Sequence, residues 1–96
     1  MTCWTITKDH IAEPGDPPAT NTNATGMVGP HTATLTAAQI IGHPDAKRFR
    51  LLDDDGEIYY EGFLIGDEFA PLDDFGEPNA GCTAVQILAD GRWSDL

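Results

Sequence analysis

The chain has 96 residues, of which 41% are hydrophobic, and its 16 Asp and Glu against five Lys and Arg give a formal net charge of −11. This length predicts a single domain, residues 1–96, and the apolar fraction is that of a folded globule rather than of a disordered chain. The charge argues against direct binding to nucleic acid, because such binding depends on Lys and Arg. It also disfavours anionic membrane surfaces and favours a basic protein partner.

The sequence contains no apolar run near 18 residues, and its N-terminus lacks a basic region followed by an apolar stretch. We therefore expect neither a membrane span nor a signal peptide, and we expect a cytoplasmic protein. Cys3 and Cys82 have no CxxC spacing, and two thiols alone cannot complete a tetrahedral zinc site. In the cytoplasm they are expected to be reduced, partly buried hydrophobic residues; the alternative is a disulfide between the first strand and a late one.

The first predicted element is a strand over residues 2–7, where alternation places Trp4 and Ile6 on one face. Residues 13–31 then form a long loop rich in Pro, Gly, Asn and Thr. Loops of this length in compact domains tend to be functional or disordered. Within this loop, Met27 and Val28 are expected either to anchor it to the core or to form an exposed contact.

A short helix is predicted over residues 37–41. Thr36 and Gln39 match a capping box, and Leu35 and Ile40 have the spacing of a hydrophobic staple. Gly42 ends the helix at its C-terminal side, and the proline that follows blocks its continuation.

A β-hairpin is predicted from residues 47–52 and 57–64, which flank an Asp-Gly turn signal. If Asp55-Gly56 is a two-residue turn, Arg50 lies opposite Glu61 and Leu51 lies opposite Tyr60. The Arg50–Glu61 pair favours this register. The same register would place Asp54 opposite Glu57, so a longer turn with a bulge is the alternative.

Residues 66–81 are expected to be irregular, with Phe69, Leu72 and Phe75 inserted into the core. A strand over residues 82–88 follows, then a turn over 89–91 and a short final strand or extended tail. The predicted fold class is α+β, with a three- to four-stranded antiparallel sheet, one short helix and long irregular loops. The expected core residues are Trp4, Ile6, Leu51, Tyr60, Ile87 and Trp93.

Known catalytic and metal motifs fit the sequence poorly. An EF-hand loop with Gly56 at its sixth position would need oxygen ligands at Leu51 and Gly62, which have none to offer from their side chains. His10, His31 and His43 lack the spacing of a metal pair, and Cys82 has no recognisable catalytic context. A looser site from Asp53, Asp55 and Asp73 or Asp74 is the remaining metal alternative. We therefore predict no catalytic, metal-binding or cofactor-binding residues, and a protein that is not an enzyme.

The distribution of charge is the one strong anomaly in the sequence. No basic residue lies between Arg50 and Arg92, whereas ten acidic residues lie within residues 53–77. We expect these acids to form one continuous negative surface, with Tyr59 and Phe63 exposed among them as apolar anchors. The alternative is that the acidity only keeps the protein soluble. The predicted partner-binding residues are Asp53, Asp54, Asp55, Glu57, Tyr59, Glu61, Phe63, Asp67, Glu68, Asp73, Asp74 and Glu77.

Two segments carry a resemblance to known proteins: FRLLDDDGEIYYEG, residues 49–62, and PLDDFGEPNAGCT, residues 71–83. Both resemble small uncharacterised acidic bacterial proteins, many of them actinobacterial or borne by phages and plasmids. The resemblance implies a bacterial or mobile-element context. In size and charge the chain also resembles small acidic phage inhibitors, including anti-CRISPR proteins that mimic the charge of DNA.

The sequence therefore predicts an acidic protein-interaction module, a monomer or homodimer. Its partner would be a basic protein, in the sharpest form a nucleic-acid-handling complex such as a CRISPR effector, which the module would inhibit. Two alternatives remain: an accessory protein that binds its partner through residues 13–31, and a small metal-binding protein or enzyme.

Overall fold

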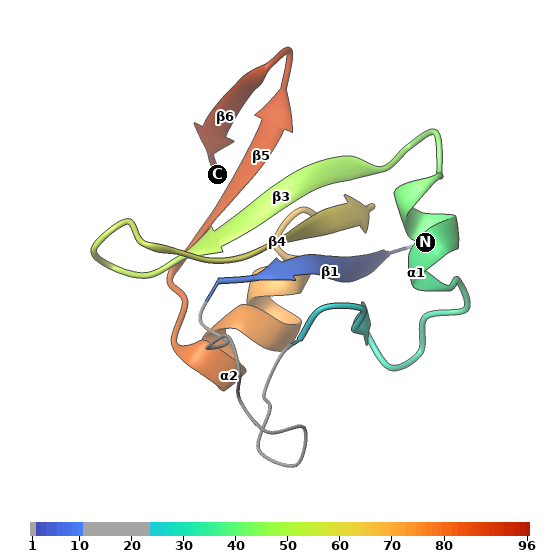
Figure 1. The fold of residues 1–96 in the computed structure, drawn as a ribbon, viewed down its shortest axis with the longest axis horizontal. Helices are drawn as coiled ribbons and strands as arrows, with labels where there is room; N and C mark the ends of the chain where they lie inside the picture. Colours follow the sequence, from blue (N-terminus) through green and yellow to red (C-terminus); the bar gives the residue numbers. More distant parts are fainter. Residues whose placement is uncertain (1, 11–23) are drawn as a thin grey trace.

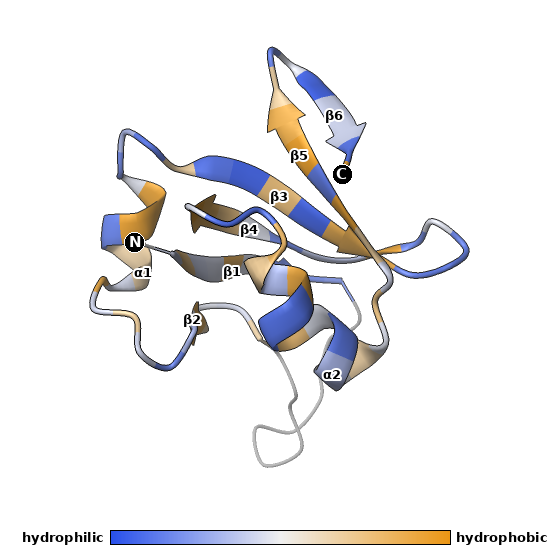
Figure 2. Cartoon of the chain, turned by 180° about the vertical axis from the view of Figure 1, so that it is seen from behind, coloured by the Kyte–Doolittle hydropathy of each residue, from blue (hydrophilic) through white to orange (hydrophobic). Residues whose placement is uncertain are grey.

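The computed structural model describes residues 2–10 and 24–96. Within them all the strands join one antiparallel sheet, in the order β2-β1-β4-β3-β5-β6 (Figure 1; β2 is labelled in Figure 2). The α+β class is confirmed, but the prediction of three to four strands is wrong, because the sheet has six. The elements are β1 (Cys3–Asp9), β2 (Val28–Gly29), α1 (Ala37–Ile41), β3 (Lys47–Leu52), β4 (Ile58–Ile65), the π-helical segment η1 (Leu72–Gly76), α2 (Glu77–Ala80), β5 (Ala84–Ala89) and β6 (Arg92–Asp95).

The unexpected strand, β2, is only two residues long, so no alternating pattern could reveal it. Trp4 pairs with Gly29 and Thr5 with Val28 at this edge of the sheet. Val28 is half-buried and packs beside α1, whereas the side chain of Met27 is 45% exposed. The two residues therefore divide the roles that the sequence left open: Val28 anchors the chain and Met27 faces solvent. Residues 13–23 of the predicted loop lie outside the described residues.

The β3–β4 hairpin has the predicted register, with Arg50 opposite Glu61 and Leu51 opposite Tyr60. Its turn is one residue longer than the Asp55-Gly56 turn, because the N–H of Asp53 donates to the carbonyl of Glu57 at 3.0 Å. Gly56, at φ +82°, closes this three-residue loop, a conformation that glycine adopts without strain. A bulge then makes Tyr59 the extra residue of β4 and restores the register, as in the longer-turn alternative.

One face of the sheet is covered by η1 and α2 (Figure 2). Phe75 is the centre of this layer: its ring centroid lies 4.8 Å from that of Tyr60 and 5.5 Å from that of Trp4. Five of the six predicted core residues are buried on this side, namely Trp4, Ile6, Leu51, Tyr60 and Ile87.

The prediction of an irregular stretch over residues 66–81 is wrong, because η1 and α2 make residues 72–80 helical. Leu72 and Phe75 are buried as predicted, since one turn separates them and both face the sheet. Phe69 precedes the helical segment and is 46% exposed, which contradicts its predicted place in the core. Its N–H donates to the side chain of Asp67 at 2.9 Å, so the chain turns here before the helix begins.

The predicted helix over residues 37–41 is confirmed as α1, with both hydrogen bonds of the Thr36–Gln39 capping box formed. It packs against one end of the opposite sheet face. Ile40 is fully buried there in a second hydrophobic cluster with Cys3 and Ile65, and Leu35 packs against this cluster. Both cysteines are fully buried, rather than partly buried as predicted, and they are not joined in a disulfide.

The rest of that opposite face we call the open face, made up of Lys8, Arg48, Arg50, Glu61, Gln86, Trp93 and Asp95. Trp93 was predicted in the core, which is wrong. It pairs with Leu88, and successive residues of a strand point to opposite faces. Because Ile87 is buried on the covered side, Leu88 and Trp93 point to the open face. The indole is instead half-exposed under the guanidinium of Arg50, at 4.3 Å, and near that of Arg48, at 5.8 Å.

Candidate interaction surface

The hairpin tip carries four of the predicted partner-binding acids, and they do not play the same role. The carboxylate of Asp53 accepts the backbone N–H groups of Asp55 and Glu57, each at 2.9 Å. These bonds, and a further one from the Tyr59 hydroxyl, lower the pKa of Asp53. Asp53 is thus part of the turn itself, whereas Asp54, Asp55 and Glu57 are exposed and available to a partner.

The helical cover carries three more predicted residues, Asp73, Asp74 and Glu77, all exposed. Its C-terminal end adjoins the base of the hairpin. The N–H of Cys82 donates to the carbonyl of Gly76 at 3.1 Å, and the N–H of Thr83 donates to that of Leu52 at 2.9 Å. We call these two groups the acidic side: Asp53, Asp54, Asp55, Glu57, Asp73, Asp74 and Glu77.

The remaining predicted acids lie elsewhere, so the acids of residues 53–77 do not form one continuous surface. Asp67 and Glu68 follow the far end of β4, about 26 Å along an eight-residue strand from the hairpin tip. Glu68 pairs there with Lys47, at 3.3 Å between Nζ and Oε2.

Glu61 belongs to the open face and is surrounded by basic side chains. Its carboxylate lies 2.7 Å from Nε2 of His10 and 3.8 Å from the guanidinium of Arg48. Lys8 and Arg50 are its cross-strand neighbours on β1 and β3. Beyond Arg50, side-chain hydrogen bonds continue through Gln86 to Asp95. The acidic and basic side chains of this row neutralise one another, so the charge of Glu61 contributes little attraction to a basic partner.

The two predicted aromatic anchors are half-buried rather than exposed. Tyr59 packs against the covered side of the sheet because it is the bulge residue, and its hydroxyl meets Asp53, which raises the pKa of Tyr59. Phe63 packs against the cluster under α1. Neither ring adds an apolar anchor to the acidic side.

All five Lys and Arg residues lie on β1, β3 and β6. The hairpin tip and the helical cover contain none. The stack of Arg48 and Arg50 on Trp93 was not predicted from the sequence. The alternation of Arg48 and Arg50 with the apolar Phe49 and Leu51 indicated that one face of β3 is charged. The position of Trp93 could not be predicted in this way, because Trp93 lies on β6, which is joined to β3 only through β5.

The structure bears on two of the alternatives drawn from the sequence, a nucleophilic Cys82 and a metal site. Burial raises the pKa of the Cys82 thiol to about 11, which is the opposite of what a nucleophilic cysteine needs. No three His, Cys, Asp or Glu side chains within residues 2–10 and 24–96 are grouped so as to hold a metal ion. None of the helices in this part of the chain is long and apolar enough to cross a bilayer. The chain matches no protein-family model, no curated protein and no solved structure.

Proposed function

We propose that this protein is a non-enzymatic interaction module that binds a basic protein through its acidic side. The observation that supports this is the separation of charge between elements. Seven carboxylates lie on the hairpin tip and the helical cover, where no Lys or Arg lies beside them in sequence, and every Lys and Arg is on β1, β3 or β6. A one-signed surface of this kind attracts a basic partner over a distance and speeds the encounter.

The sharper form of the proposal makes the partner a nucleic-acid-handling protein in the cytoplasm. Such proteins bind phosphates through Lys and Arg grooves, and carboxylates fixed on a rigid scaffold compete for the same groove. The protein would then act as an inhibitor, in keeping with its resemblance in size and charge to phage proteins that mimic DNA.

The test begins by capturing the partner from a lysate of the native host and then measures its affinity in purified form. The variant Asp54→Asn/Asp55→Asn/Glu57→Gln removes three exposed charges from the tip and keeps Asp53, which the turn needs. The control Asp45→Asn/Asp67→Asn/Asp90→Asn removes three exposed charges from outside the acidic side. We expect the tip variant to weaken binding about tenfold or more, equivalent to about 1.4 kcal/mol, and the control to change it less than about twofold.

Added salt should weaken the wild-type complex steeply. An affinity that does not depend on salt, or equal losses in the tip variant and the control, would contradict the proposal. The alternative of binding through residues 13–31 makes the opposite prediction. Deleting residues 16–22 would then abolish binding, and neutralising the hairpin tip would leave it unchanged.

A further inference from the structure

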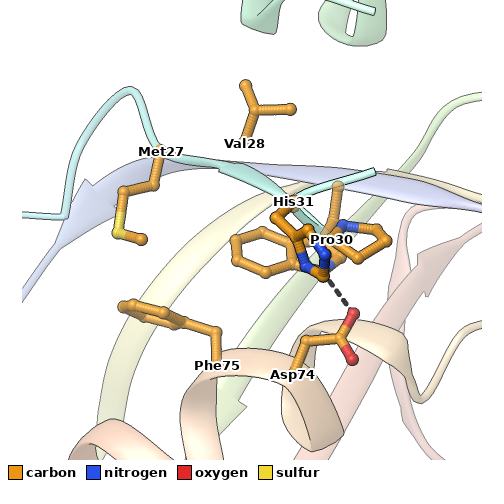
Figure 3. A pocket seen from close by; sticks show the side chains of 8 residues that line it. Met27, Val28, Pro30, His31, Asp74 and Phe75 are labelled. Carbon is orange, nitrogen blue, oxygen red and sulfur yellow. Dashed lines mark hydrogen bonds between the residues drawn. The ribbon is translucent and has the colours of Figure 1, made fainter. Parts of the chain in front are cut away.

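A pocket of about 320 Å³ opens between β2 and η1, next to the acidic side (Figure 3). The chain from Met27 to His31 forms one wall, and Asp74 and Phe75 of η1 form the other. Its volume is at the lower end of the range of about 300–1,000 Å³ that ligand pockets occupy. This size suits one long side chain better than a large cofactor.

The pocket combines an apolar wall with a single carboxylate. Met27 and Phe75, from opposite walls, lie toward one end of the opening, and Asp74 lies toward the other end (Figure 3). Met27 is 45% exposed at the rim, and its flexible thioether can adapt to an alkyl chain. Phe75 is almost fully buried and supplies a fixed wall, because it is wedged against Trp4 and Tyr60.

The hydrogen bonding in the pocket favours a ligand that donates. The indole N–H of Trp4 donates to Oδ2 of Asp74 at 3.0 Å, so this donor is already used. The same bond fixes the position of the carboxylate, which has about four acceptor sites in all. None of the described residues that line the pocket is a Lys or Arg, and the protein as a whole carries −11. Among these described lining residues, only His31 has a side chain that offers another N–H donor.

We propose that this pocket receives the side chain of a lysine or arginine presented by a basic partner. The alkyl stem would lie against Met27 and Phe75, and the cationic head would pair with Asp74. This inference rests on the proposed function and deepens it. Long-range attraction draws in any basic surface, whereas a pocket recognises one particular side chain of the partner. The pocket would supply the short-range contact that the half-buried Tyr59 and Phe63 do not provide.

The test uses the peptide acetyl-Gly-Lys-Gly-amide and follows the two tryptophan indole N–H signals by NMR. Trp4 reports on the pocket, and Trp93, on the open face, is the internal control. We expect the Trp4 signal to move in a saturable way and the Trp93 signal to stay in place. The arginine peptide should act similarly, whereas peptides with norleucine or glutamate in place of lysine should not move the Trp4 signal.

Two single variants separate a local contact from general attraction. Asp74→Asn removes the charge but keeps an oxygen that can accept the Trp4 N–H, so the fold should persist. Asp73→Asn removes an equal charge from the neighbouring exposed residue of η1, which does not line the pocket. We expect Asp74→Asn to weaken the lysine peptide about tenfold or more and Asp73→Asn by less than about twofold.

The inference is overturned if the lysine peptide leaves Trp4 unmoved, if norleucine binds as well as lysine, or if the two variants weaken binding equally. A variant that fails to fold would lose the dispersed Trp93 signal, and His31→Ala then replaces it as a probe of the pocket wall, with a changed peptide affinity expected. None of these measurements needs the natural partner. The proposal for the pocket can therefore fail while the hairpin-tip variant still weakens partner binding, and the reverse outcome is equally distinguishable.

Discussion

Gly29 lies against the indole of Trp4, and this contact limits position 29 to glycine. A Cβ atom there would lie 2.2 Å from Cζ2 of Trp4, well inside van der Waals contact. Gly62 plays the same part in the centre of the sheet, where a Cβ would lie 1.9 Å from the carbonyl oxygen of Thr5. A Cβ on Gly62 would also lie 2.9 Å from Cζ of Phe49. The close packing of Trp4 against Gly29 and of Phe49 against Gly62 therefore requires glycine at both positions.

The variant Gly29→Ala should destabilise the protein by about 1–3 kcal/mol, the usual cost of forcing extra atoms into a packed site. Urea unfolding followed by circular dichroism measures the change. Gly42→Ala is the matched control: its backbone is already helical and the nearest atom would lie 3.4 Å away, so the change should stay within about 0.5 kcal/mol. Equal midpoints for wild type and Gly29→Ala would show that Trp4 can move aside without cost.

At the scale of elements, the hairpin depends on one ionised side chain. The carboxylate of Asp53 holds the N–H groups of Asp55 and Glu57 across the turn, and its pKa is lowered by these bonds. A group whose pKa is lower in the folded state stabilises the fold above its unfolded pKa, about 3.9 for Asp. This contribution is lost as the pH falls through the lower, folded value.

We therefore expect Asp53 to titrate at lower pH than a carboxylate with an unperturbed pKa. Carboxyl carbon shifts followed by NMR from neutral pH down to about pH 2 give the midpoint directly. The amide signals of Asp55 and Glu57 should move with the titration of Asp53, because they are its donors. A midpoint for Asp53 at or above about 3.9 would contradict the role assigned to these bonds.

The elements that the sequence predicted well are those with local signals. The Thr36–Gln39 capping box, the Asp-Gly turn and the alternation of Trp4 and Ile6 each act within a few residues, and each is confirmed. The helical segment over residues 72–80 was missed, because its Gly, Pro and Asp content is typical of a loop. It forms because Leu72 and Phe75 are buried against the sheet, which is a tertiary effect that overrides weak local propensity.

At the scale of the whole molecule, the protein confines −11 within a radius of gyration of 12.8 Å. The ion pairs of the open face and of Lys47–Glu68 lie at the surface, where each is worth about 0–1 kcal/mol. Repulsion among the unpaired carboxylates should therefore exceed the attraction in these pairs. Self-repulsion of this kind destabilises a compact state.

Added NaCl should accordingly raise the melting temperature. Between about 10 mM and 150 mM salt the Debye length falls from about 30 Å to about 8 Å, which screens the repulsion. In a domain of this size about 1 kcal/mol corresponds to a shift of about 4–8 °C, so calorimetry resolves the effect. The tip variant lacks three of the eleven net negative charges, so its melting temperature should rise less with salt than that of the wild type. A melting temperature that falls with salt would mean that the surface ion pairs dominate.

For the predicted partner-binding residues, too, the sequence showed the local features, and the tertiary structure was needed for their arrangement in space. The sequence located the acids of residues 53–77 and their lack of basic neighbours, and it identified the hairpin that displays four of them. It did not separate Glu61, Asp67 and Glu68 from the others, because this depends on the sheet face and strand end that each occupies. Nor could it place Met27 and Asp74 on two walls of one pocket, since 46 residues separate them in the chain.

The sequence by itself determined the size, the net charge, the α+β class and the local elements, because composition and short-range hydrogen bonding decide these. Only the tertiary structure decided where the charge lies. Strand pairing placed every Lys and Arg on β1, β3 and β6, and burial of Leu72 and Phe75 turned Asp73, Asp74 and Glu77 outward. The acidic side and its pocket exist because burial of apolar side chains fixed the orientation of the charged ones.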